Sequence, residues 1–159
     1  NDQIEIGFGP EGTVVGAFTV TGFTLHPSYH GMAGIATSSP EAQLYDLAII
    51  SFDGELSDRM VPARLAEPNY IYTGMPVVVA GYGAIATNDQ ARRPLSWLIT
   101  ELSSLNNRYN ELQIKQGIGL GACYGDSGGP AFIVASDSRC LQLIGSISGR
   151  ATNQNRSII

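Results

Sequence analysis

Residues 125–130 read Gly-Asp-Ser-Gly-Gly-Pro and run directly into an apolar segment at 131–135. A nucleophilic serine must project from a tight turn, and the backbone N–H groups beside it must converge on one point to hold a developing oxyanion. Gly125 gives the backbone the freedom that such a turn needs and lets a substrate carbonyl approach closely. An ordinary glycine-rich turn is the plainer interpretation, but it explains the whole hexapeptide poorly. The segment therefore indicates a nucleophile at Ser127.

Outward from this segment, the chain consists of short apolar runs separated mostly by Gly, Pro, Asn, Asp or Ser. Runs that alternate or are rich in β-branched residues are typical of a β-barrel or sandwich, and the high glycine count of 19 favours an all-β chain with many turns. The segment 95–105 could also form a helix, but its neighbours favour a strand. The expected strands cover residues 3–8, 13–25, 45–52, 75–82, 95–105, 112–118, 130–135 and 140–148.

Composition excludes several classes of partner. The net charge of -5 argues against nucleic acid, because phosphate binding needs a basic face. No apolar stretch reaches the roughly 18 residues that a membrane span requires, so no membrane partner is expected. Cys123 and Cys140 have neither zinc-ligand spacing nor a nearby histidine, so we expect no metal. Their even number permits one disulfide bond.

Two further segments could belong to a functional site, one because of its glycine motif and the other because of an aspartate. Residues 7–12 match the dinucleotide-binding pattern Gly-x-Gly-x-x-Gly, but the segment that follows is β-branched rather than helical, so a turn is favoured and no cofactor is expected. Asp46 lies at the head of an apolar run at 45–50. A buried aspartate there would need a strong partner, because desolvating a carboxylate is costly. Alone it would be interpreted as a turn residue, but together with the serine segment it becomes a candidate catalytic acid.

Four segments together resemble the trypsin/chymotrypsin family of serine proteases: the serine hexapeptide at 125–130, Asp-Leu-Ala-Ile-Ile at 46–50, His-Pro-Ser-Tyr at 26–29 and Ala-Gly-Tyr-Gly at 80–83. Their order and spacing suit that family over nearly the whole chain. The resemblance implies a chymotrypsin-like double antiparallel β-barrel with the active site between the barrels. Residues 1–65 would form the remainder of an N-terminal barrel, 66–74 the connection, and 75–159 the C-terminal barrel that carries the nucleophile.

The resemblance also implies roles for individual residues. Ser127 is the expected nucleophile, Asp46 the acid that orients a catalytic histidine, and the N–H groups of Gly125 and Ser127 the oxyanion hole. Asp126 corresponds to the carboxylate that, in many members, pairs with the new N-terminus after zymogen cleavage.

Substrate recognition is expected from two further segments. Gly121 and Ala122 correspond to the floor of the primary specificity pocket, and Ser148 with Gly149 corresponds to the strand that hydrogen-bonds the substrate backbone. A pocket without a carboxylate at its floor cannot pair a lysine or arginine, so a specificity unlike that of trypsin is expected. An apolar or aromatic substrate side chain is expected instead, because a glycine floor leaves depth and no charge. Arg150 near the pocket mouth is the alternative and would favour an acidic side chain, although a solvated arginine is the plainer interpretation.

The histidine of the family is missing from its usual Ala-Ala-His-Cys segment. His26 and His30 lie elsewhere, and neither is expected to act as the base. Because residues 3–7 resemble the strand that follows that histidine, we expect the fold to be incomplete at both ends and the base to come from a second chain or a missing segment. Cys123 would pair with a downstream cysteine or with Cys140.

The expected function is a secreted or periplasmic endopeptidase acting on polypeptides through an acyl-enzyme. A pseudoprotease that only binds partners and an esterase with the same triad are the alternatives.

Overall fold

The computed structural model describes residues 5–6, 18–29, 45–56, 58, 60–84, 94–106, 111–117, 121–134, 140–150 and 156–159. Within these ranges the regular elements are β-strands, apart from one short 3-10 turn, η3, at Pro68–Tyr70. The chain divides into two compact units, Asn1–Val61 and Pro62–Ile159. The described part is therefore all-β, as the pattern of short apolar runs predicts.

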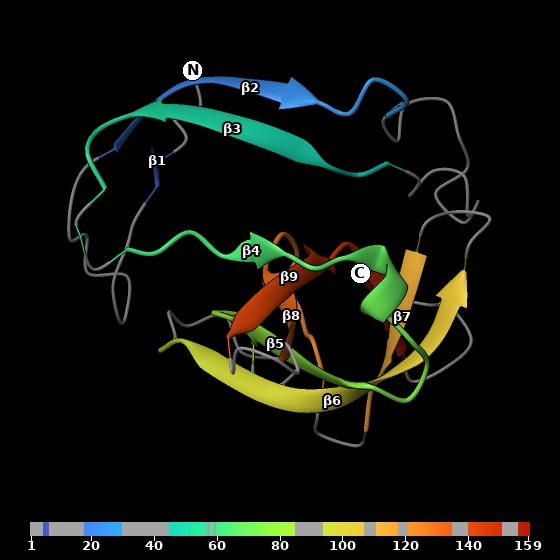
Figure 1. The fold of residues 1–159 in the computed structure, drawn as a ribbon. Coiled ribbons are helices and arrows are strands. Elements are labelled where there is room, and N and C mark those ends of the chain that lie inside the picture. Colours follow the sequence, from blue (N-terminus) through green and yellow to red (C-terminus); the bar gives the residue numbers. More distant parts are fainter. Residues whose placement is uncertain are drawn as a thin grey trace. The chain divides into compact units, whose positions relative to one another are not determined.

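The first unit contains a three-stranded antiparallel sheet in the order β1-β2-β3 (Figure 1). The strands are β1 (Glu5–Ile6), β2 (Phe18–Leu25) and β3 (Ala48–Asp53). Phe18 is buried and packs edge-to-face against Phe52 on β3, with ring centroids 5.2 Å apart. Gly54, with φ +141°, follows β3 and lies close to the Phe18 ring, so a side chain at that position would collide with the ring. This aromatic pair anchors the β2–β3 hairpin at one end.

The second unit is built on an eight-stranded sheet in the order β10-β11-β7-β6-β5-β8-β9-β4 (Figure 1). Neighbouring strands are antiparallel, except that the two-residue edge strand β4 pairs parallel with β9. The strands are β4 (Arg64–Leu65), β5 (Pro76–Gly81), β6 (Ser96–Asn106), β7 (Glu111–Lys115), β8 (Pro130–Val134), β9 (Leu141–Ser146), β10 (Gly149–Arg150) and β11 (Arg156–Ile158).

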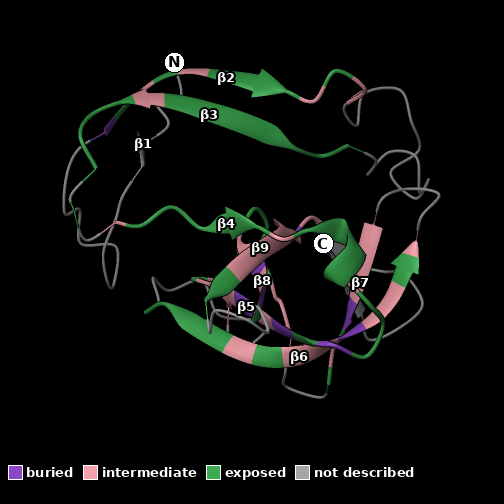
Figure 2. Cartoon of the chain, in the orientation of Figure 1, coloured by how far each residue is buried: buried purple, intermediate pink, exposed green. Residues whose placement is uncertain are grey.

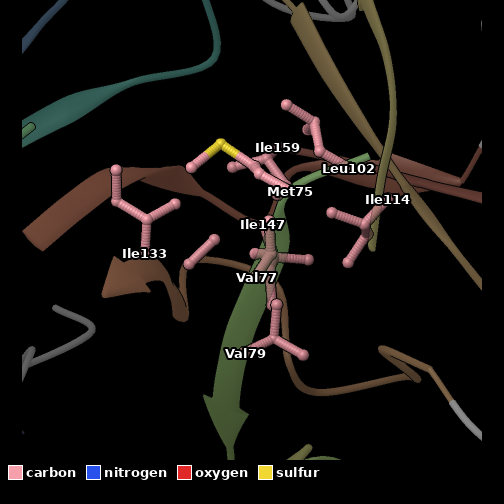
Figure 3. Packing of buried hydrophobic residues seen from close by; sticks show 9 residues of the cluster. Met75, Val77, Val79, Leu102, Ile114, Ile133, Ile147 and Ile159 are labelled. Carbon is pink, nitrogen blue, oxygen red and sulfur yellow. The ribbon is translucent and has the colours of Figure 1, made fainter. Parts of the chain in front are cut away.

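The hydrophobic core of this second unit follows from strand alternation. Successive side chains on a strand point to opposite faces, so residues two apart share one face. Val77 and Val79 on β5, with Ala131 and Ile133 on β8, are accordingly buried. Figure 2 shows buried residues on β5 and β8, whereas β2 and β3 of the first unit are mainly exposed. Figure 3 shows core side chains gathered around β5; the cluster comprises Met75, Val77, Val79, Leu102, Ile114, Ala131, Ile133, Ile147 and Ile159.

The expected strands are confirmed wherever the structure describes them, including the ambiguous segment 95–105, which forms β6. The short strands β4, β10 and β11 were not expected, because two or three residues are too few to produce a periodic pattern. The glycine motif at 7–12 lies outside the described residues. The proposed barrel limits at 65 and 75 stay a prediction.

Candidate active site

Ser127 lies in a tight turn that leads into β8, and it is exposed. Backbone hydrogen bonds fix the turn from within, since the N–H of Asp126 donates to the Cys123 carbonyl at 3.1 Å and the N–H of Gly129 donates to the Asp126 carbonyl at 2.8 Å. Gly125 and Gly128 have φ of +91° and +82°, a region that residues with a side chain rarely adopt. The glycines on either side of Asp126 and Ser127 are thus required by the turn itself.

The same turn is tied to the segment that follows β9. The N–H of Gly128 donates to the Ile147 carbonyl at 2.7 Å, and the N–H of Ile147 donates to the Gly129 carbonyl at 2.8 Å. Ile147 is buried in the core, so this reciprocal pair joins the turn to a rigid part of the sheet. Ser148 and Gly149, the expected substrate-binding strand, come directly after Ile147, and Gly149 begins β10. The serine turn and this strand are therefore held together.

Asp126 turns its carboxylate inward, onto backbone donors of its own unit. Oδ1 accepts the N–H of Gly83 at 2.8 Å, and Oδ2 accepts the N–H of Cys123 at 2.8 Å. Side chains at Gly81 or Gly83 would collide with this carboxylate. Asp126 therefore connects the end of β5 with the serine turn, and the glycines of the 80–83 segment leave room for it.

Gly125 and Ser127 differ from their neighbours in their backbone donors. The N–H groups of Cys123, Asp126 and Gly129 all donate to oxygen atoms. Among the hydrogen bonds between described residues, none has the N–H of Gly125 or Ser127 as its donor. A negatively charged oxygen at this turn could accept both N–H groups without displacing a bond that holds the turn.

Gly121 and Ala122, the expected pocket floor, lie just before the serine turn. Gly121 has φ +151°, and Ala122 packs against the hydrophobic core. Gln116, which follows β7, covers this segment, and its Nε2 donates to the Ala122 carbonyl at 2.7 Å. The four residues assigned to substrate recognition, together with Ser127, Gly125 and Asp126, thus all belong to the second unit.

Asp46 belongs to the first unit and is exposed rather than buried. It is the middle residue of a turn in which the N–H of Leu47 donates to the Tyr45 carbonyl at 2.7 Å, just before β3 begins. β3, which follows Asp46, is itself largely exposed. Tyr45 has φ +59°, a strained value for an aromatic residue, which sets the direction of the chain at Asp46. The approach of Asp46 to Ser127 stays a prediction.

His26 supports this turn but has the wrong hydrogen bonding for a triad base. The His26 ring stacks on Tyr45 with centroids 4.6 Å apart, and the backbone N–H of His26 donates to the Leu47 carbonyl at 2.9 Å. Its Nδ1 accepts the N–H of Ser28 at 3.1 Å. The base of a catalytic triad instead donates Nδ1–H to the acid, so this arrangement excludes that tautomer. His30 lies outside the described residues.

Cys123 and Cys140 are both free thiols in the structure, so the two are not joined by a disulfide bond. The pairing of Cys123 with a downstream cysteine stays a prediction. Among the described residues, no cluster of His, Cys, Asp and Glu could hold a metal ion. The described part of the chain likewise contains no helix long and apolar enough to span a membrane.

Sequence reasoning missed the contributions of Gln116, Tyr45 and Gly83. Gly83 belongs to the Ala-Gly-Tyr-Gly segment at 80–83. Its N–H donates a hydrogen bond to Asp126, a residue far away in sequence, and no local pattern shows such a contact. No signal in the sequence singled out Gln116 or the backbone of Tyr45.

The described part of the chain is all-β, and its sheets are consistent with the chymotrypsin-like fold class. The family model for Trypsin matches residues 11–158, nearly the whole chain. This chain therefore belongs to the trypsin family. No individually curated protein matches it.

Proposed function

We propose that this chain carries the nucleophile and the acid of a serine endopeptidase that hydrolyses peptide bonds through an acyl-enzyme. One observation carries the proposal: Ser127 is exposed in a hydrogen-bonded turn, and within the described part of the chain no hydrogen bond has the N–H of Gly125 or Ser127 as its donor. This combination is what acyl transfer needs, namely an accessible hydroxyl next to fixed donors for an oxyanion. Membership of the trypsin family supports the same chemistry.

In the proposed reaction, the Ser127 hydroxyl attacks the scissile carbonyl and a histidine takes its proton. The carbonyl oxygen becomes an anion, which the N–H groups of Gly125 and Ser127 would stabilise. The histidine then gives its proton to the leaving amine as the C–N bond breaks, and water releases the acyl group by the same steps in reverse. The histidine is proposed to come from a second chain or a further segment, because His26 has the other tautomer.

Asp46 is proposed to hold that histidine in the tautomer with a proton on Nδ1. The exposure of Asp46 leaves its turn accessible to such a partner. Asp126 is proposed to pair with a new N-terminus on activation. Its carboxylate already accepts two N–H bonds, and about four lone-pair sites per carboxylate leave room for an ammonium group.

Gly121 and Ala122 are proposed to form the pocket floor, and Ser148 and Gly149 to bind the substrate backbone. The floor residues carry no charge, which supports a preference for substrate side chains other than lysine or arginine. Secretion or export to a periplasm belongs to the same proposal, since trypsin-family proteins are commonly secreted.

Peptidase assays on the protein assembled with its histidine test this function. We expect a peptide library to be cleaved, and Asp46→Asn to lower kcat by about four orders of magnitude, as loss of the correct tautomer does. Asp53→Asn is the matched control, because Asp53 ends β3 and is also exposed. If the assembled protein binds peptides without cleaving them, it is a pseudoprotease. If it cleaves esters but no peptide, it is an esterase.

A further inference from the structure

Gln116 fills the space that a side chain at position 121 would occupy. A Cβ atom built on Gly121 would lie 2.7 Å from Cγ and 2.9 Å from Cδ of Gln116, closer than real Cβ atoms approach other atoms. The backbone of Gly121 also has φ +151°, which disfavours any residue with a side chain. Position 121 therefore presents no side chain of its own, and the group found at that point is the side chain of Gln116, from Cβ to the carboxamide carbon Cδ.

The carboxamide is fixed rather than free to swing away. Gln116 is half-buried, and its Nε2 donates to the Ala122 carbonyl at 2.7 Å. Because Ala122 packs against the hydrophobic core, this bond fastens the Gln116 side chain to a rigid part of the unit. The contact is thus a built feature of the segment that precedes the serine turn.

The sheet topology connects Gln116 with the proposed substrate-binding strand. Gln116 follows β7, β7 pairs with β11, and β11 pairs with β10, so that Ile114, Ser157 and Arg150 lie in register across three strands. β10 begins with Gly149, two residues after Ile147, which is bonded to the serine turn. Gln116 therefore lies in the unit and sheet that carry the other proposed recognition residues.

We propose that Gln116 determines specificity: its carboxamide forms the floor of the primary pocket at Gly121 and Ala122, and the pocket selects uncharged side chains of small or medium size. The inference rests on the proposed function, because it takes Gly121 as the floor. A carboxamide is neutral and cannot pair with a buried cation, which disfavours lysine and arginine. It also occupies the depth that a glycine would otherwise leave, which disfavours large aromatic side chains.

The first test measures a charged ligand and needs no catalysis. p-Aminobenzamidine, a flat aromatic cation whose fluorescence rises on burial, is titrated into the wild-type protein and into Gln116→Glu. A carboxylate at the floor should raise the association constant by about 10- to 100-fold, the range of one charge-assisted hydrogen bond. Gln113→Glu is the matched control, since Gln113 lies on β7 and its Oε1 accepts the Ser104 hydroxyl at 3.0 Å, which a glutamate can still do. The control should bind like the wild type.

A second variant keeps the proposal testable if Gln116→Glu does not fold. Gln116→Ala removes the side chain from the floor and should raise the affinity for indole by about tenfold, because an aromatic ring can then reach Gly121. The proposal is overturned if a folded Gln116→Glu binds p-aminobenzamidine no better than Gln113→Glu does. It is equally overturned if Gln116→Ala binds indole no better than the wild type, or if the wild type binds the cation as tightly as Gln116→Glu.

These binding measurements are separable from the proposed reaction. Labelling of Ser127 by a fluorophosphonate, in the protein assembled with the part that carries the histidine, reports on acyl transfer alone. If labelling fails while binding follows the Gln116 variants, the pocket assignment stands and the endopeptidase function falls. If labelling succeeds while the Gln116 variants leave binding unchanged, only the pocket assignment is overturned.

Discussion

Asparagine has nearly the same size as aspartate, but replacing Asp126 by asparagine should loosen the turn that carries Ser127. In the wild type, the two carboxylate oxygens accept the N–H groups of Gly83 and Cys123, each at 2.8 Å. Asparagine keeps one acceptor but turns an NH₂ group toward the other N–H. One donor then loses its partner, at about 1–3 kcal/mol, and the remaining bond weakens from charged to neutral, at about 1 kcal/mol. The two terms sum to about 2–4 kcal/mol for a fully buried carboxylate. Because Asp126 is only half-buried, we expect Asp126→Asn to lower the free energy of unfolding by less, about 1–3 kcal/mol.

Urea denaturation at neutral pH measures this difference, with the midpoint and slope fitted for both proteins. Glu67→Gln is the matched control, because Glu67 is exposed in the same unit and its side chain caps no hydrogen bond. The control should stay within about 0.5 kcal/mol of the wild type. An Asp126→Asn protein equally close to the wild type would refute the reasoning that this carboxylate holds the turn.

Three further changes test other parts of the fold. Leu102→Ala should cost about 2–5 kcal/mol of unfolding free energy, because Leu102 is fully buried in the core. Gly83→Ala should cost about 1–3 kcal/mol of unfolding free energy, because the added Cβ would push the Asp126 carboxylate away from the Gly83 N–H. Gly22→Ala is its control and should be near neutral, since a Cβ at Gly22 would have nothing within 4 Å. Burial raises the pKa of Glu111, so its ionisation opposes folding and stability falls as the pH rises through and above the ordinary value of 4.5. Glu111→Gln should therefore be more stable than the wild type at neutral pH, and the gain should vanish well below that pH range. Denaturation curves of each variant and of the wild type give these differences, with Glu111→Gln measured at neutral pH and well below pH 4.5. A midpoint equal to that of the wild type would contradict the prediction for Leu102→Ala, for Gly83→Ala or, at neutral pH, for Glu111→Gln, whereas Gly22→Ala should match the wild type.

The strands could be predicted because their signal is local. A segment such as 75–82 carries its alternation in its own residues, and the structure forms β5 there with Val77 and Val79 inside. The same reasoning could not find β4 or β10, whose two residues hold no period. β4 pairs with β9, which lies far along the chain, so its position depends on information that is not local.

The residues of the candidate site show the same contrast between local and long-range information. The need for backbone freedom at Gly125 could be predicted from the hexapeptide, and its φ of +91° confirms it. The bond from Gly83 to Asp126 and the contact of Gln116 with Gly121 join residues from different elements, so only the fold reveals them. Asp46 was expected to be buried because its segment is apolar, but the side chains that follow it on β3 are themselves largely exposed.

The most direct test of the central claim is the rate at which a fluorophosphonate labels Ser127, measured by mass spectrometry of the modified peptide. The chain alone should react slowly, because loss of the catalytic histidine in subtilisin costs about a million-fold in turnover. When the part that carries the histidine is present, labelling should become rapid and stoichiometric at Ser127, and Ser127→Ala should abolish it. Rapid labelling of the chain alone would mean that it contains its own base. No labelling of Ser127 in the assembled protein would contradict its assignment as the nucleophile.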